Sequence, residues 1–99
     1  MQIIFTIEAK QYLEDLRAFL RPLSPSGLAN VTRRLEECIL PVPDFPKIGR
    51  PTPRAVVREV IETRYGFVIP YYFKGGNLYI LRVYRTARKP LDYAAIKLP

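Results

Sequence analysis

The chain lacks histidine and tryptophan and contains a single cysteine, Cys38. Without histidine there is no Ser-His-Asp triad, no histidine general base and no histidine-rich metal site. One thiol cannot form an internal disulfide, a Cys–His pair or a usual zinc site. We therefore expect no metal and no cofactor. Cys38 falls on the apolar stripe of a predicted helix, so we expect it to pack in the core.

Long hydrophobic runs are also absent, since no stretch approaches the roughly 20 apolar residues of a membrane span. The first eight residues lack the basic region and long apolar core of a signal peptide. We therefore expect a cytoplasmic protein that does not bind membranes. A chain of 99 residues suffices for one core, and we expect residues 1–99 to form a single domain.

Acidic residues are scarce in the second half of the chain. Residues 1–46 carry five bases and six acids, a net charge of −1, whereas residues 47–99 carry eleven bases and three acids, a net charge of +8. Most of those eleven bases are arginine, whose planar guanidinium pairs with phosphate or carboxylate through two hydrogen bonds. This asymmetry predicts an acidic partner, either nucleic acid or an acidic protein surface.

The first half of the chain predicts one strand and two helices. Residues 2–7 are β-rich, and from residue 9 apolar side chains recur every three or four positions, which predicts a helix ending near residue 21, before Pro22. Ser24 is expected to cap a second helix with Pro25 at its first position. The short connection predicts a helical hairpin. The apolar face of the second helix comprises Leu28, Val31, Leu35, Cys38 and Ile39.

The second half predicts a loop followed by three strands. Residues 41–54 contain five of the ten prolines, which predicts an ordered or semi-ordered loop with no regular element. Strands are expected at 55–62, 66–74 and 77–85, with Gly75-Gly76-Asn77 as a hairpin turn. Pro70 removes a donor and predicts a bulge or an unpaired stretch. The β-α-α-β-β-β order predicts an α+β fold, with a mostly antiparallel sheet, the helical hairpin on one face and the other face uncovered.

Two acids and one arginine are predicted to have structural roles. On a strand, Glu59 and Glu62 lie on opposite faces, which argues against a paired carboxylate site. Arg82 shares a strand face with apolar neighbours, and burying it unpaired would be costly. We expect a structural ion pair between Arg82 and Glu59, with Glu62 as the other possible partner. Contact between Arg82 and a binding partner is the alternative.

Anion binding is the predicted role of Arg85 and Arg88, which lie where the last strand ends. For four further arginines the pattern allows surface charge or binding equally: Arg50, Arg54, Arg58 and Arg64. Tyrosines interleave with these bases, a composition used to bind single-stranded RNA, although aromatic residues at alternate strand positions are more often core residues.

The order and spacing of these segments resemble the RelE/ParE superfamily of toxins from bacterial type II toxin–antitoxin modules. The resemblance covers nearly the whole chain and rests on the helical hairpin, Gly49-Arg50, Arg58-Glu59 opening a strand, the stretch 65–73 (Tyr-Gly-Phe-Val-Ile-Pro-Tyr-Tyr-Phe), and the stretch 78–88 (Leu-Tyr-Ile-Leu-Arg-Val-Tyr-Arg-Thr-Ala-Arg). The ending is similar to the ParE branch, although many members have histidine where this chain has Arg85.

The ParE resemblance implies a toxin that inhibits DNA gyrase, arrests growth and is neutralised by a cognate antitoxin. It implies a binding protein rather than an enzyme. The antitoxin is expected to be acidic in its toxin-binding segment and to land on the helical hairpin or the sheet edge. On this reading the target-binding residues are Arg50, Arg58, Arg85 and Arg88.

The RelE branch implies a different activity, ribosome-dependent cleavage of messenger RNA. A metal-independent endoribonuclease of that kind would use Arg85, Arg88 and Tyr93 on the ribosome. Its pattern fits poorly here, because the strand 55–62 has no pair of lysines and Gly66-Phe67-Val68 stands where such enzymes usually have an arginine. A superfamily member that has lost toxicity and only binds an antitoxin is the third possibility.

Overall fold

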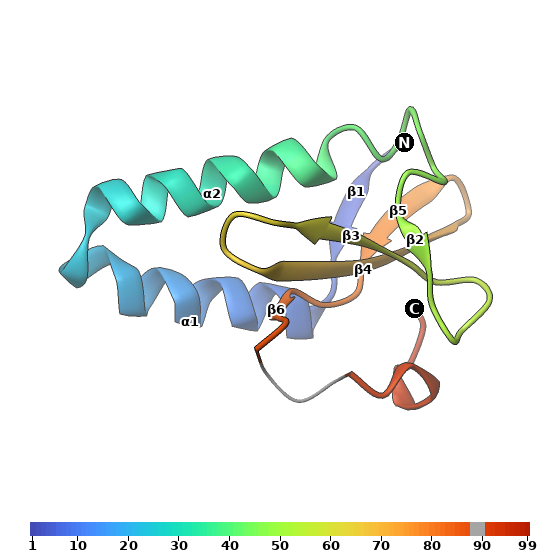
Figure 1. Ribbon diagram of the computed structural model, residues 1–99. Coiled ribbons are helices and arrows are strands. Elements are labelled where there is room, and N and C mark those ends of the chain that lie inside the picture. Colours follow the sequence, from blue (N-terminus) through green and yellow to red (C-terminus); the bar gives the residue numbers. More distant parts are fainter. Residues whose placement is uncertain (88–90) are drawn as a thin grey trace.

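The computed structural model describes residues 1–87 and 91–99 and shows a helical hairpin beside a mostly antiparallel sheet (Figure 1). This confirms the predicted α+β architecture. The elements in chain order are β1 (Ile3–Phe5), α1 (Ile7–Leu23), α2 (Pro25–Ile39), β2 (Arg50–Pro51), β3 (Arg58–Glu62), β4 (Phe67–Lys74), β5 (Asn77–Ile80), β6 (Tyr84–Arg85) and the 3-10 helix η1 (Tyr93–Ala95).

Polar caps determine where the two helices begin. The Thr6 hydroxyl accepts a hydrogen bond from the Ala9 N–H at 3.2 Å, which ends β1 early and starts α1. The Ser24 hydroxyl accepts from the Gly27 N–H at 3.0 Å, confirming the predicted cap of α2. The prediction that α1 ends near residue 21 is wrong, because Pro22 lies inside the last turn. Pro22 removes one hydrogen bond of that turn, and because the helix ends one residue later, no further turn depends on it.

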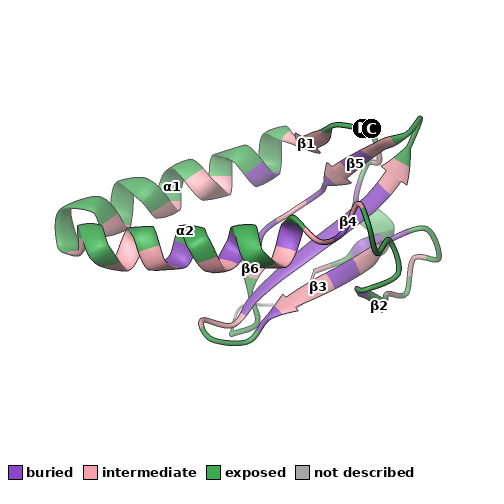
Figure 2. Ribbon diagram, turned by 90° about the horizontal axis from the view of Figure 1, so that it is seen from above, coloured by how far each residue is buried: buried purple, intermediate pink, exposed green. Residues whose placement is uncertain are grey.

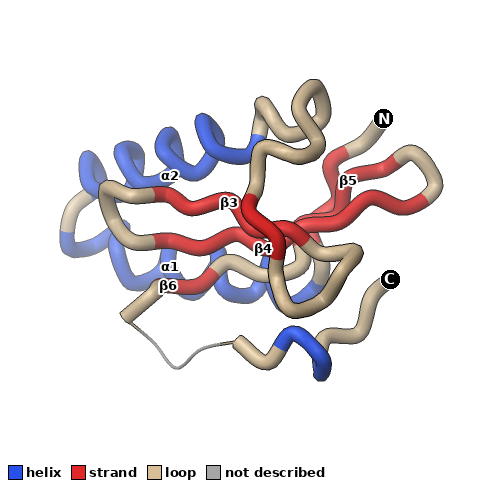
Figure 3. Tube along the Cα trace, turned by 45° about the vertical axis from the view of Figure 1, so that its right-hand side comes forward, coloured by secondary structure: helices blue, strands red, loops and turns tan. Residues whose placement is uncertain are grey.

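The strands of the described residues form one sheet in the order β1-β5-β4-β3-β2, with β6 also beside β4 (Figure 3). Among the described strands, β1 and β5 run parallel and the other pairs are antiparallel. Two features differ from the prediction: β3 begins at Arg58 rather than residue 55, and the prediction of no regular element in the proline-rich loop is wrong, because the loop contains the short edge strand β2. β2 forms there because it pairs with β3, a long-range contact that local composition does not report.

The predicted strand 77–85 is interrupted after Ile80, and the cause is Pro70 on β4. The Leu81 N–H donates to the Pro70 carbonyl at 2.9 Å. Within a strand, the N–H and C=O of one residue point to the same edge, so the donor that Pro70 lacks faces residues 81–83. Pairing with β4 resumes only at β6, where Tyr84 lies opposite Val68. The expected unpaired stretch near Pro70 is therefore confirmed.

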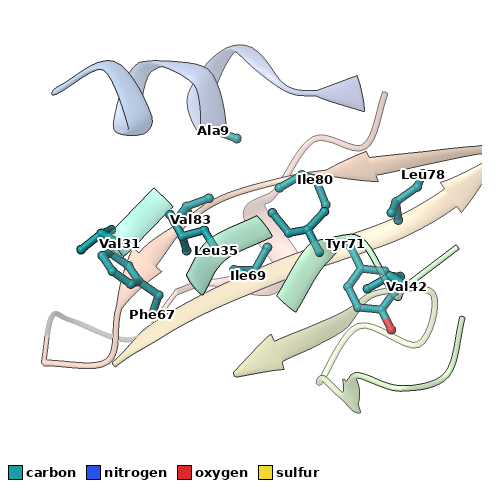
Figure 4. Packing of buried hydrophobic residues seen from close by; sticks show 11 residues of the cluster. Ala9, Val31, Leu35, Val42, Phe67, Ile69, Tyr71, Leu78, Ile80 and Val83 are labelled. Carbon is teal, nitrogen blue, oxygen red and sulfur yellow. The ribbon is translucent and has the colours of Figure 1, made fainter. Parts of the chain in front are cut away.

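The main core lies between the helical hairpin and one face of β4 (Figures 2 and 4). Residues Phe67, Ile69 and Tyr71 of β4 point into it and pack with the buried face of α2. Cys38 is partly buried against the same cluster, which confirms its predicted packing role. The buried members are Ala9, Val31, Leu35, Ile39, Val42, Phe67, Ile69, Tyr71, Leu78, Ile80 and Val83.

The prediction that the second face of the sheet is uncovered is wrong. Residues 91–99 lie across it and form a second buried cluster, which comprises Val57, Tyr72, Leu81, Tyr93 and Ile96. A guanidinium nitrogen of Arg54 (Nη1) holds this segment by donating to the Tyr93 carbonyl at 3.1 Å and to the Ile96 carbonyl. Among the described residues, no helix is long and apolar enough to cross a membrane.

A buried carboxylate, Glu62, joins α2 to the turn between β3 and β4. Its Oε2 accepts hydrogen bonds from Arg34 Nε at 3.0 Å and from the Arg64 N–H at 2.8 Å. Its Oε1 accepts from the Tyr65 N–H at 2.8 Å. Burial raises the pKa of this carboxyl, but the backbone donors and Arg34 outweigh it, so the pKa is lowered overall.

We predict that Glu62→Gln lowers the free energy of unfolding by about 2–3 kcal/mol at pH 7, because charge-assisted hydrogen bonds are lost in a buried site. The pKa of Glu62 in the folded state lies below its unfolded value of about 4.3. Its ionised carboxylate therefore stabilises the protein above that pH, and this stabilisation is lost as the pH falls through the folded-state pKa. Urea denaturation should therefore show the difference between wild type and variant shrinking below about pH 4.

The matched control is Glu37→Gln, since Glu37 pairs with the same Arg34 but is half exposed. Removing a charge from such a surface pair should cost less than about 1 kcal/mol. Equal losses for the two variants, or a difference that does not change with pH, would contradict this role of Glu62.

Candidate functional site

Arg85 lies at the end of the sheet on the side that the helices cover. It is exposed, and its guanidinium carbon lies 5.6 Å from the centroid of the Phe67 ring, within reach of a cation–π contact. Phe67 is its register partner on β4 and belongs to the helix-side core. Arg85 is therefore held over an aromatic ring while its charge stays available to an anion.

A groove of about 570 Å³ opens between the two helices and the end of the sheet. Phe19, which is 65% exposed, and Leu20 form part of its α1 wall. Arg85 and Asp15 supply charges of opposite sign to the same groove. The lining is otherwise mainly apolar and aromatic, with Tyr12, Leu16, Val31, Tyr65 and Phe67. Such a surface suits a partner segment that combines apolar and charged side chains.

The structure does not bring together Arg85 and Tyr93, the two described residues of the set expected to cleave RNA. Tyr93 is buried in the second cluster, and its hydroxyl lies 3.4 Å from the Tyr84 hydroxyl. Tyr84 pairs with Val68 on β4, one residue along from Phe67, so it faces the opposite side of the sheet from Arg85. Arg85 and Tyr93 are thus separated by the sheet. Arg88 lies outside the described residues.

Arg50 and Arg58 lie near the β2 edge and are both engaged. Arg50 Nε donates to Glu59 Oε1, although most of the Arg50 side chain remains exposed. Arg58 Nη1 donates to the Gly49 carbonyl at 2.8 Å and so stabilises the preceding loop. Of these two candidates, Arg50 is the one whose guanidinium offers more surface to a partner.

The predicted Arg82–Glu59 ion pair is wrong. Arg82 Nη1 lies 3.4 Å from Glu8 Oε1 of α1 and donates to the Leu81 carbonyl at 2.7 Å. The prediction assumed regular alternation through residue 85, but the interruption after Ile80 turns Arg82 toward α1. Glu59 pairs instead with Arg50, because β2 lies beside β3.

A polar cluster that the sequence did not reveal surrounds Glu59 on the second face. Its Oε2 is buried and has no hydrogen-bond partner among the described residues. The pKa of the nearby Tyr84 hydroxyl is raised by burial and by the Glu59 carboxylate, with Arg50 opposing the shift. No group of three or more acids, cysteines or histidines in the described part of the chain is placed to hold a metal ion.

Comparison with known proteins now decides the family. The family model described as the ParE toxin of the type II toxin–antitoxin system parDE matches residues 3–90. The chain belongs to the ParE toxin family. Among solved structures, a chain of the chromosomal ParDE toxin–antitoxin system from P. aeruginosa is similar, with 25% identity and a TM-score of 0.73 over 86% of this chain and 95% of that one. A comparison with curated protein sequences found no match.

Family membership confirms the resemblance to ParE toxins and gives the general class of function. This ParE-family chain is the toxin type of a type II toxin–antitoxin system, and that class implies a cognate antitoxin partner. The groove at Arg85 and the exposed side of Arg50 are the features of the described residues that could engage a partner.

Proposed function

We propose that this ParE-family protein inhibits DNA gyrase by binding it, with no chemistry of its own, and that an antitoxin segment neutralises it. The supporting observation is that Arg85 and Tyr93 face opposite sides of the sheet. An arginine stabilises a developing phosphorane, but RNA cleavage also needs a group that takes the 2′-hydroxyl proton. Tyr93 lies on the face of the sheet opposite Arg85, so the two side chains do not face one site.

The charge distribution supports an acidic target surface. Residues 47–99 carry the net charge of +8, and Arg85 is exposed at one end of the sheet. We retain Arg50, Arg58, Arg85 and Arg88 as the proposed target-binding residues, the last on sequence alone. Residues 1–99 are proposed to act as one domain in the cytoplasm, where DNA gyrase works.

The groove beside Arg85 is the proposed antitoxin site. Its mainly apolar lining offers a place for an amphipathic helix or an added strand to bury its apolar side chains. Arg85 would then pair with a carboxylate of that segment, which explains why an acidic antitoxin is expected. A segment seated there covers Arg85 and apolar surface together.

We predict that purified protein inhibits supercoiling by DNA gyrase and that Arg85→Glu weakens this inhibition at least about tenfold, the effect of losing roughly 1.4 kcal/mol of binding. Arg33→Glu is the matched control, because Arg33 is exposed on α2 away from the groove and pairs only with Glu37 among the described residues. Plasmid supercoiling, followed on gels, measures both.

Three outcomes would decide against gyrase inhibition. Full supercoiling at a large excess of toxin excludes it. Transcripts cut during translation, mapped by primer extension while gyrase stays active, would favour the ribonuclease activity. Harmless overexpression without the antitoxin would indicate a member that has lost toxicity. Equal weakening by Arg33→Glu would show that net charge, rather than Arg85, drives binding.

We also predict that Phe19→Ser lowers antitoxin affinity about 10- to 100-fold, because an aromatic anchor of the groove is removed. The variant should unfold at the wild-type temperature, since Phe19 is mostly exposed. Calorimetric titration with the cognate antitoxin measures the affinity. Leu40→Ser, an equally exposed site near the far end of α2, is the control and should bind normally. Unchanged affinity for Phe19→Ser would rule out the groove.

A further inference from the structure

Three large apolar side chains are displayed to solvent on the loop between α2 and β2. Leu40 is 62% exposed, Phe45 is 64% exposed and Ile48 is 56% exposed. Residues 44–48 line an open hollow of about 650 Å³. We refer to residues 40–48 as the proline loop, since they include Pro41, Pro43 and Pro46. Large apolar side chains on a solvent-exposed surface are typical of protein-interaction sites.

The proline loop is held in one conformation by the sheet. The Tyr71 hydroxyl accepts a hydrogen bond from the Gly49 N–H at 3.0 Å and donates one to the Pro46 carbonyl at 2.7 Å. Val42 is fully buried in the main core and anchors the first part of the loop. A Cβ on Gly49 would lie 2.7 Å from the Tyr71 ring, so the loop packs on that ring too closely for any other residue at position 49.

Turns inside the loop fix the outward side chains. The Phe45 N–H donates to the carbonyls of Pro41 and Val42 at 3.0 and 3.1 Å, and the Ile48 N–H donates to the Phe45 carbonyl at 2.9 Å. Phe45 and Ile48 are therefore exposed on an ordered backbone. Burying them against a partner therefore costs little conformational entropy of the loop, as is typical of preorganised anchor residues.

The charges bordering this apolar surface are mostly positive. Lys47 is exposed between Phe45 and Ile48, and Arg50 follows with most of its side chain in solvent. Asp44 is the only acid between residues 40 and 50. The complementary surface is an apolar pocket bordered by carboxylates.

The proline loop and the connection between α1 and α2 lie at opposite ends of the helical hairpin (Figures 1 and 3). The groove includes Gly27 at the start of α2, whereas the loop begins at Leu40, beyond its end. Thirteen residues of helical rise separate these two positions by roughly 20 Å. One short antitoxin segment in the groove therefore leaves the loop accessible.

We propose that the proline loop is a docking surface for the target protein, with Phe45 and Ile48 as anchors and Lys47 and Arg50 facing carboxylates around the receiving pocket. The identity of the target rests on the proposed gyrase function, but the location of the surface does not. Target recognition and antitoxin recognition then use separate apolar anchors on one small domain, whereas Arg85 takes part in both.

The test compares two matched double variants in cells and in vitro. Phe45→Ser with Ile48→Ser removes the loop anchors; Ile7→Ser with Leu23→Ser removes two exposed apolar side chains of α1 that line neither the loop hollow nor the Arg85 groove. The loop variant should require at least about tenfold more inducer to arrest growth while binding the antitoxin normally. The α1 variant should arrest growth normally and bind the antitoxin normally. Thermal unfolding checks that both are folded.

A third variant, Lys47→Glu, tests the charge without touching packing and should weaken growth arrest several-fold. Full growth arrest by both the loop variant and Lys47→Glu would overturn the proposal. It would also be overturned if the loop instead mediated self-association, seen as a wild-type dimer that the loop variant makes monomeric with arrest unchanged. If wild-type protein arrests growth but does not affect gyrase, the gyrase assignment fails while the growth assay still tests the loop.

Discussion

The central strand β4 must be covered on both faces, and the rest of the fold follows from this constraint. Its first six residues, Phe67 to Tyr72, are all buried. The helical hairpin covers the face that carries Phe67, Ile69 and Tyr71, and residues 91–99 cover Tyr72 on the other face. Because both faces are covered, a partner can reach only the ends and edges of the described sheet. Arg85 and the proline loop lie at those two ends.

Pro70 sets the second constraint, because it removes a donor from the middle of that strand. The strand beside it is interrupted after Ile80 and resumes as the two-residue β6. The interruption turns Arg82 toward Glu8 of α1 and leaves Arg85 at the rim of the groove. The donor that Pro70 lacks thus leads to different roles for two arginines three residues apart: Arg82 makes a structural contact, and Arg85 is a candidate binding residue.

Local signals in the sequence predicted the helices, the Ser24 cap and the break near Pro70, because each depends on neighbouring residues. Residues 91–99 were missed because they have no regular apolar period and are held by long-range contacts with Arg54. The Arg50–Glu59 pair likewise depends on β2 lying beside β3. The sequence does not show whether an apolar residue of an irregular loop, such as Phe45, will be buried or exposed. The exposed surface of the proline loop was therefore not predictable.

The separation of Arg85 from Tyr93 by the sheet supports the proposal that this toxin acts by binding its target rather than by catalysis. The most direct test titrates purified toxin against a fixed, micromolar concentration of DNA gyrase while supercoiling is followed. A binding inhibitor should reach its full effect near equimolar toxin and should leave the transcripts of a translating extract intact. Full inhibition at a small fraction of one toxin per gyrase, increasing with time of incubation, would contradict this account.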